Sequence, residues 1–308
     1  QSGHVVERPR PRPGPVLTVR ILITGVSGQD GSYLAEHHTS RGHDVFGMVR
    51  SPARPGWARH LAGVRIVAGD LLDQASLERI LTDVAPDEVY NLAAVTAPGG
   101  GWADPTPPLL ADITGLGVLH LCEAIRLRAP GAVLVHASSS AIYEPHRYGL
   151  YGAAKRFAHD TVAGYRQAGF RFSNAVLYSH TSPRQNPQFV ARRITTAVRN
   201  IAAGHTSQLV LGNVDNLRDW GYAPDYMRAM AALARAETPT DLVVATGIRH
   251  SVRDFTNAAL AAAGLDWGVV RVAGGPTWDE PPAPAERILT SGWIPFDTMV
   301  KLMVEAEP

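Results

Sequence analysis

Apolar stretches of strand length alternate with stretches of helical periodicity through the first 180 residues of this chain. The strand-length stretches read as apolar on both faces, which is typical of parallel strands covered by helices on each side. The pattern predicts strands over residues 19–24, 44–50, 64–70, 88–93, 132–138 and 173–178, and helices over 29–41, 74–83, 109–128 and 151–167. The fold class that follows is α/β, with a doubly wound parallel Rossmann sheet.

The alternation loosens after residue 178. Helices are expected over residues 189–203, 225–236 and 296–304, and strands over 208–211 and 241–245. These pieces predict a smaller, discontinuous α/β lobe that binds the substrate, with a cleft between the lobes. The Rossmann domain is expected to comprise residues 18–180 and about 213–246, and the smaller lobe about 181–212 and 247–308. Residues 1–17 begin like a tag remnant and are rich in proline, which predicts a disordered tail.

Composition and charge are those of an ordinary globular protein. Of 308 residues, 45% are hydrophobic and 19% are charged, and the formal net charge is +1. This balance gives no electrostatic reason to expect nucleic acid or an anionic membrane as partner. No apolar run is expected to be long enough to span a bilayer. The single cysteine, Cys122, lies in a helical pattern and is expected to be buried, which fits a cytoplasmic location without disulfides.

Three glycines, Gly25, Gly28 and Gly31, stand between the first predicted strand and the first predicted helix. Such glycines allow a tight turn, a close approach of the backbone to a pyrophosphate, and close packing of helix on strand, in that order. The helix N-terminus then faces the phosphates. A glycine-rich turn alone is often only a loop, but the strand before it and the helix after it indicate a dinucleotide site that includes Gln29 and Asp30.

The second predicted strand ends in a cation, where enzymes that bind NAD usually carry an acidic residue. Arg50 and Ser51 offer hydrogen-bond donors to a 2′-phosphate, so the predicted cofactor is NADP; a surface arginine is the alternative.

Two further strand ends are expected to contact the cofactor. Asp70 and Leu71 close the third strand and fit an adenine contact, although Asp70 could equally cap the following turn. Leu92 and Ala93 follow the fourth strand and are expected beside the cofactor ribose.

Tyr151 and Lys155 stand four residues apart in a predicted helix, behind a strand that ends in serines. This spacing places both side chains on one helix face, so the ammonium is expected to stabilise the phenolate and lower the Tyr151 pKa. Ser139 can then hold a substrate hydroxyl while Tyr151 takes or gives its proton. The pair alone is a weak signal, because an exposed helix can carry it by chance. Its order after the glycine turn and the serines indicates hydride transfer at a carbinol carbon.

These residues resemble the extended short-chain dehydrogenases, and specifically the GDP-mannose 4,6-dehydratase family of NAD-dependent epimerases and dehydratases. The likeness covers roughly residues 19–305, through motifs at 23–34, 86–94, 180–184 and, most specifically, LGNVDNLRDWG at 211–221. It implies oxidation of a nucleotide-linked hexose at C4, loss of water across C5 and C6, and return of hydride to C6. It further implies a cofactor contact at His180 and a homodimer through residues 109–128 and 151–167. A tetramer stays open, because residues 53–57 look shortened.

The chain departs from this family at the residue that handles the C5 proton. The family carries a glutamate two positions after its Ser/Thr; here Ser139 is followed by Ala141, which cannot transfer a proton. Glu144 and His146 are the nearest replacements in sequence, and loop residues facing solvent are the favoured interpretation of both.

The resemblance also implies cations for a diphosphate, with a GDP-hexose favoured as the substrate. Arg193 and Arg218 match the family's nucleotide contacts, whereas Arg271 only loosely replaces a lost arginine. Arg192 could equally belong to a polar helix face. No metal is expected, since structural hydrogen bonds explain His136 and His180 better than metal ligation.

The open outcomes are dehydration, epimerisation, ketoreduction, or a catalytically silent sensor that binds NADP. The silent alternative is favoured by Ala141 and opposed by the retained Ser139, Tyr151 and Lys155.

Overall fold

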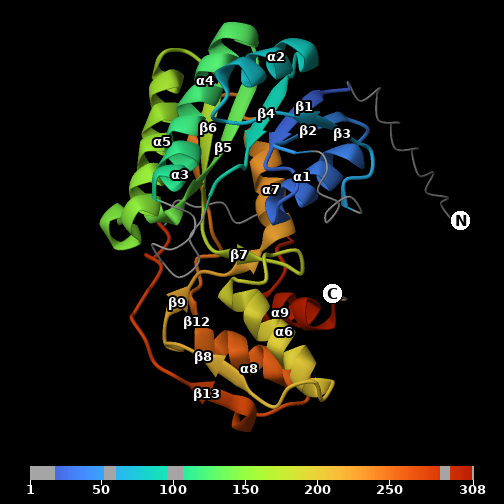
Figure 1. Cartoon of the computed structure of the whole chain (residues 1–308), viewed down its shortest axis with the longest axis vertical. Helices are drawn as coiled ribbons and strands as arrows, with labels where there is room; N and C mark the ends of the chain where they lie inside the picture. Colours follow the sequence, from blue (N-terminus) through green and yellow to red (C-terminus); the bar gives the residue numbers. More distant parts are fainter. Residues whose placement is uncertain (1–17, 52–59, 96–106, 285–291, 307–308) are drawn as a thin grey trace, which may run out of the picture.

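A seven-stranded sheet is the centre of the computed structural model, which describes residues 18–51, 60–95, 107–284 and 292–306 (Figure 1). The predicted tail 1–17 and the shortened region 53–57 therefore lie outside the described residues. The strands run in the order β11-β6-β5-β4-β1-β2-β3, and every neighbouring pair is parallel. They are β1 (Arg20–Thr24), β2 (Asp44–Val49), β3 (Val64–Ala68), β4 (Glu88–Asn91), β5 (Val133–Ser139), β6 (Phe172–Leu177) and β11 (Asp241–Val244).

Helices cover both faces of this sheet, as Figure 1 shows, and each face buries its own apolar core. One face carries α1 (Gln29–Thr39) and α7 (Ala223–Leu233). The opposite face carries α2 (Gln74–Val84), α4 (Gly117–Arg128) and α5 (Gly149–Gln167). Burial of apolar side chains on both faces supplies the main driving force for this arrangement. The predicted doubly wound α/β fold is confirmed.

The strand register brings the predicted functional loops to one edge of the sheet. Thr24, Asn91 and His136 are register partners on β1, β4 and β5, and His136 pairs with Asn174 on β6. Because these strands are parallel, the segments that follow them emerge side by side at their carboxyl ends, where ligands bind in open α/β sheets.

Two expectations about apolar stretches are wrong. The strand β3 is not apolar on both faces: it lies at the edge of the sheet, and the Ile66 side chain is exposed. In the described residues one stretch, Pro107–Arg128, is long and apolar enough to cross a bilayer. It comprises α3 (Pro107–Ala111), a π-helical segment (Asp112–Leu116) and α4, and more than half of it is buried, as in a core helix.

A smaller lobe lies below the sheet in Figure 1 and has a third apolar core. Its helices are α6 (Val190–Ala202), α8 (Val252–Ala262) and α9 (Phe296–Glu305). Short strands pair beside them: β8 (Leu209–Leu211) with β13 (Val270–Val272), and β9 (Leu217–Arg218) with β12 (His250–Ser251). Between the lobe and the sheet, β7 (His180–Thr181) pairs with β10 (Gly221–Tyr222).

Candidate active site

The glycine turn after β1 is built on contacts that exclude side chains. Gly25 has a φ of +67°, and a Cβ there would lie 2.8 Å from the backbone nitrogen of Ala93. A Cβ on Gly31 would lie 2.5 Å from the Cα of Val26. Gly28 precedes α1 as its N-cap without a side-chain cap. Backbone amides therefore dominate this end of the helix, a suitable surface for an anion.

Ser139, Tyr151 and Lys155 come together at the carboxyl end of β5. The phenol of Tyr151 is hydrogen-bonded to the Ser139 hydroxyl, which also accepts a bond from the Ala141 amide at 3.2 Å. The Lys155 ammonium lies 6.0 Å from the centre of the Tyr151 ring and donates to the Ala137 carbonyl at 2.8 Å. The helix α5 thus presents its tyrosine and lysine to the strand that carries the serine.

The expectation that Lys155 lowers the Tyr151 pKa is wrong: in this structure the pKa is raised. Burial raises the pKa of the Tyr151 phenol, the bond to Ser139 lowers it in part, and the charge of Asp30 raises it further. Burial also lowers the pKa of Lys155 to about 8, against a smaller opposing effect of Asp30. Removing both groups from water opposes ionisation of each, and that cost outweighs their attraction.

Asp30 and His180 form an ion pair beside these residues. The Asp30 Oδ2 lies 3.0 Å from the His180 Nε2, and Gln29 donates to the other carboxylate oxygen at 2.9 Å. The pair joins the glycine turn to β7, and its charge acts on Lys155. Three of the predicted cofactor contacts are therefore in mutual contact beside the predicted catalytic residues.

The other predicted cofactor residues lie at neighbouring strand ends. Arg50 and Ser51, after β2, are exposed. The Asp70 carboxylate accepts a hydrogen bond from the Leu72 amide at 3.0 Å, so it does cap the following turn, as the alternative expected. Leu71 is buried in the core. Leu92, partly buried, donates its backbone N–H to the Thr24 carbonyl at 3.3 Å.

The predicted diphosphate cations occupy two separate elements. Arg193 is exposed on α6, and Arg218 is half-buried on β9, where its charge acts on Tyr148 and Glu280. The polar-face interpretation is wrong for Arg192, whose side chain is buried. Arg271 is exposed on β13, away from these strands.

Neither candidate replacement for the family's glutamate points to a free base. Glu144 is paired with Arg147 at 2.7 Å. His146 is exposed and lines an apolar surface groove with Leu150 and Arg156. Ala141 itself is buried. The structure places His146 in a short 3-10 helix, Pro145–Tyr148, with the half-buried Glu144 at its start, so only His146 faces solvent as expected.

A buried carboxylate that the sequence did not single out lies directly behind the serines. Glu280 is 3% exposed and accepts a hydrogen bond from the Ser140 hydroxyl at 2.7 Å. Asp219, also buried, accepts bonds from the amides of Thr246 and Gly247. The motif at 211–221 gives a signal for Asp219, but Glu280 has only a proline-rich stretch around it.

The histidines do not form a metal site within the part of the chain that the structure describes. His136 is buried and bonded to the Asn91 amide at 3.1 Å, and burial lowers its pKa. His180 bonds the Tyr178 carbonyl at 2.7 Å through its Nδ1.

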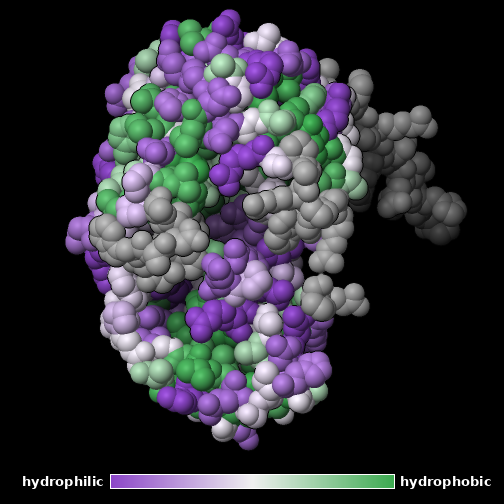
Figure 2. Space-filling view, in the orientation of Figure 1, coloured by the Kyte–Doolittle hydropathy of each residue, from purple (hydrophilic) through white to green (hydrophobic). Residues whose placement is uncertain are grey.

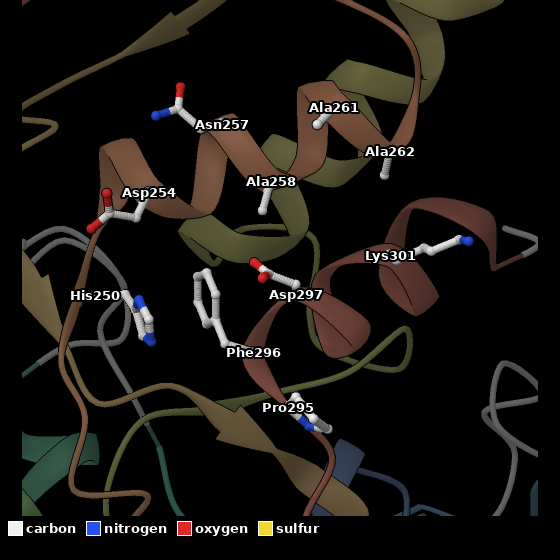
Figure 3. A pocket seen from close by; sticks show the side chains of 10 residues that line it. All are labelled: His250, Asp254, Asn257, Ala258, Ala261, Ala262, Pro295, Phe296, Asp297 and Lys301. Carbon is white, nitrogen blue, oxygen red and sulfur yellow. The ribbon is translucent and has the colours of Figure 1, made fainter.

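A cavity of about 670 Å³ lies outside this cluster, between α8 and α9 (Figure 3). His250 and Phe296 stack at one end with ring centres 3.8 Å apart, and Lys301 lies at the other end. It includes none of the predicted site residues. The surface in Figure 2 is also hollowed between the sheet and the smaller lobe, where a substrate cleft is expected.

Comparison with known proteins agrees with this geometry. The profile of a family described as GDP-mannose 4,6 dehydratase matches residues 22–274. The chain is 38% identical over 261 residues to the GDP-mannose 4,6-dehydratase of Vibrio cholerae, covering 77% of this chain and 70% of that protein. It is 36% identical over 273 residues to GDP-mannose 4,6 dehydratase 1 of Arabidopsis thaliana, covering 80% and 75%. The structure of the UDP-glucose 4-epimerase of Thermus thermophilus, in complex with NAD, is similar with a TM-score of 0.74 and 25% identity, covering 93% and 98%.

Proposed function

Because this chain belongs to the GDP-mannose 4,6-dehydratase family of NAD-dependent epimerases and dehydratases, we propose that it is an NADP-dependent enzyme that oxidises a GDP-linked hexose at C4. The observation that carries the proposal is the contact of Ser139 with Tyr151 above a buried Lys155, beside the glycine turn. A dehydratase-like outcome comes first, because the motifs run nearly the length of the chain.

The residues present fit a dinucleotide. The open amides at the start of α1 suit the pyrophosphate, and the constriction around Gly25 and Gly31 leaves the backbone itself as the binding surface. Arg50 and Ser51 are assigned to the 2′-phosphate because both are exposed at the end of β2. When bound, NADP supplies the hydride acceptor and donor. Asp70, Leu71, Leu92 and Ala93 complete the assigned contacts around the adenosine and ribose.

In the proposed reaction Tyr151 takes the proton of the C4 hydroxyl while Ser139 holds the oxygen. The bond to Ser139 lowers the Tyr151 pKa and so offsets part of the cost of ionising this buried phenol. The Lys155 ammonium is assigned as the electrostatic partner of the phenolate. Arg193 and Arg218 are assigned to the diphosphate, because guanidinium groups bind phosphate oxygens through paired donors. The proposed division of labour places the cofactor in the Rossmann domain and the sugar nucleotide in the smaller lobe.

Epimerisation or ketoreduction is the second candidate, and Ala141 favours it. The chain has no proton-transferring group at that position, and Glu144 is paired with Arg147. A C4 ketone acidifies the C5 proton, so exchange at C5 needs only a weak base, whereas elimination also needs an acid for the leaving hydroxyl.

The proposal is tested by incubating the protein and NADP with GDP-mannose, and with other nucleotide sugars, in deuterated water. Loss of water by mass spectrometry supports dehydration, and unchanged connectivity with deuterium at C5 supports epimerisation. A reduced product made with NADPH supports ketoreduction. The control is Tyr151→Phe, which should bind NADP like the parent and lose turnover. If no nucleotide sugar is turned over, the result supports the catalytically silent sensor that binds NADP.

A homodimer and a cytoplasmic location are parts of the same proposal. Leu116 and Phe157 are exposed apolar side chains within residues 109–128 and 151–167, the segments of the predicted dimer interface. The single cysteine is a buried thiol whose pKa is raised by burial, which suits a reducing compartment. A tetramer stays open. Sedimentation velocity measures the assembly directly, and Phe157→Glu is expected to shift a dimer toward the monomer.

A further inference from the structure

Glu280 joins three segments that are far apart in the sequence. Its Oε1 accepts a hydrogen bond from the Ser140 hydroxyl at 2.7 Å and one from the Ser179 amide at 3.0 Å. Its Oε2 accepts a bond from the Asp219 amide at 2.9 Å. These donors follow the ends of β5, β6 and β9, so a single carboxylate holds the carboxyl ends of two sheet strands to a strand of the smaller lobe.

The chain around Glu280 is held along its length. The Leu217 amide donates to Asp279 at 2.9 Å, and the Glu280 amide donates back to the Leu217 carbonyl at 2.9 Å. The Tyr178 hydroxyl donates to the Pro282 carbonyl at 3.2 Å. Residues 279–282 thus form a strap between β9 and the end of β6. The strap fixes the position of the Glu280 backbone relative to Ser139 and Ser140. The carboxylate is therefore held against the serines by the chain on both sides of it.

We propose that Glu280 is the positioning residue of this active site, holding the Ser139–Ser140 turn in register with Arg218 on β9. The inference rests on the proposed function for the roles of Ser139 and Arg218. Through Ser140 the carboxylate fixes the peptide that carries the Ser139 hydroxyl. Through the Asp219 amide it fixes the peptide that follows Arg218. Glu280 thereby fixes the distance between Ser139, which holds the reacting hydroxyl, and Arg218, which holds the nucleotide.

Glu280 acts through its neighbours and not as the missing base. Both of its oxygens accept hydrogen bonds, and only 3% of the residue is exposed. Two of the three donors are backbone amides, which cannot reverse their role, so the site requires a hydrogen-bond acceptor at both oxygens of the side chain. Burial raises the pKa of Glu280, and the hydrogen bonds from the Ser140 hydroxyl and the Asp219 amide offset part of that rise.

This requirement makes glutamine a poor substitute despite its identical shape. With its oxygen toward Ser179, a glutamine turns its NH₂ toward the Asp219 amide; with its oxygen toward Asp219, it turns the NH₂ toward the Ser179 amide. One pair of donors faces each other in either orientation. A merely space-filling role would tolerate glutamine, whereas the positioning role does not.

The test combines Glu280→Gln and Ser140→Ala with two measurements. Amide hydrogen exchange of residues 138–143, followed by mass spectrometry, should be faster by about tenfold or more in both variants. With the nucleotide sugar that the parent accepts, kcat should fall by about 10- to 100-fold while KM for NADP changes by less than about twofold. Asp225→Asn is the matched control: Asp225 is also fully buried and accepts the Ile294 amide at 2.9 Å, but it does not contact the serines. It should leave exchange at 138–143 as in the parent.

Unchanged exchange at 138–143 in Glu280→Gln and Ser140→Ala overturns the proposal, whatever their activity. Faster exchange with unchanged kcat also overturns it, since the contact would then be structural only. If the parent turns over no nucleotide sugar, the proposed function fails, while the exchange comparison still decides whether Glu280 holds the turn.

Discussion

The carboxylate of Asp30 and the imidazole of His180 lie 3.0 Å apart, although 150 positions separate them in the chain. Both ring nitrogens of His180 face acceptors, the Asp30 carboxylate and the Tyr178 carbonyl, so the ring needs both of its N–H groups and is charged. Burial alone would lower the His180 pKa, but Asp30, together with the Tyr178 carbonyl and Glu280, more than offsets it and the pKa is raised. Burial likewise would raise the Asp30 pKa, which His180 lowers. The Asp30 carboxylate also raises the Lys155 pKa, against the larger lowering by burial.

Asp30→Asn is therefore expected to move the alkaline limit of turnover to lower pH. Burial lowers the Lys155 pKa to about 8, and Asp30 raises it, so removing that charge lowers the pKa further. The charged ammonium exists below its pKa and is lost above it. The measurement is the pH profile of kcat, read from nicotinamide absorbance. Glu36→Gln, which removes the surface pair with Arg184, is the control and should leave the limit in place; an equal shift in both variants would contradict the assignment.

Gly31→Ala and Gly164→Ala should change stability in opposite directions. A methyl group on Gly31 meets the Gly25 carbonyl and the Val26 Cα, and the turn must open to admit it, at about 1–3 kcal/mol. Gly164, within α5, has nothing within 4 Å of a new Cβ, so alanine should stabilise the helix by about 0.5–1 kcal/mol. Urea unfolding measures both, and NADP titration should show weaker binding only for Gly31→Ala. A stable Gly31→Ala variant with parental affinity would show that the turn has room.

Arg50→Glu should reverse the preference between the two nicotinamide dinucleotides. Repulsion of the 2′-phosphate and loss of its donors should weaken NADP binding by about 10- to 100-fold, while NAD gains an acceptor for its ribose hydroxyls. Isothermal titration of both cofactors measures the change. Arg271→Glu, an exposed arginine on β13, carries the same charge reversal far from β2 and should leave both affinities near parental values. If Arg50→Glu binds NADP with parental affinity, Arg50 does not contact the 2′-phosphate and is only a surface residue.

His38 should make the fold sensitive to acid. Its ring is fully buried, and neither nitrogen has a hydrogen-bond partner within the described residues. Burial first, and then the nearby His37 and His43, lower its pKa from 6.5 to about 3. The unfolded chain therefore binds a proton below pH 6.5 that the folded chain refuses, and stability falls as the pH drops.

Below pH 6.5 and above the folded pKa of about 3, the free energy of unfolding is expected to fall by about 1.4 kcal/mol per pH unit. His38→Leu should flatten the decline of the melting temperature between pH 7 and 5, whereas His205→Gln, at an exposed histidine, should follow the parent. Identical slopes for His38→Leu and the parent would sink this explanation.

The sheet and its edge of functional loops were predictable from local patterns, because the central strands β1, β4, β5 and β6 are apolar runs and the helices between them show helical periodicity. Prediction failed where only long-range contacts define a feature. The two-residue strands β7, β9, β10 and β12 are too short to carry a period, and Glu280 acquires its role from donors that are 61 to 140 positions away. The helix α8 was missed although Ser251 and Asp254 form a capping box at its start, a signal that the sequence does contain.

The predicted effect of Lys155 on Tyr151 failed for another reason. Spacing on a helix indicates which groups are neighbours, but the balance between desolvation and attraction depends on how deeply the surrounding chain buries them.

The position of β11 has a consequence for synthesis of the protein. This strand covers the edge of β6, yet the chain between them passes through α6, β8 and β9 of the smaller lobe before it returns. On the ribosome, β6 emerges well before its partner, and its free edge stays open to neighbouring nascent chains during that interval. Translation speed through the intervening stretch therefore bears on how much of the product escapes aggregation.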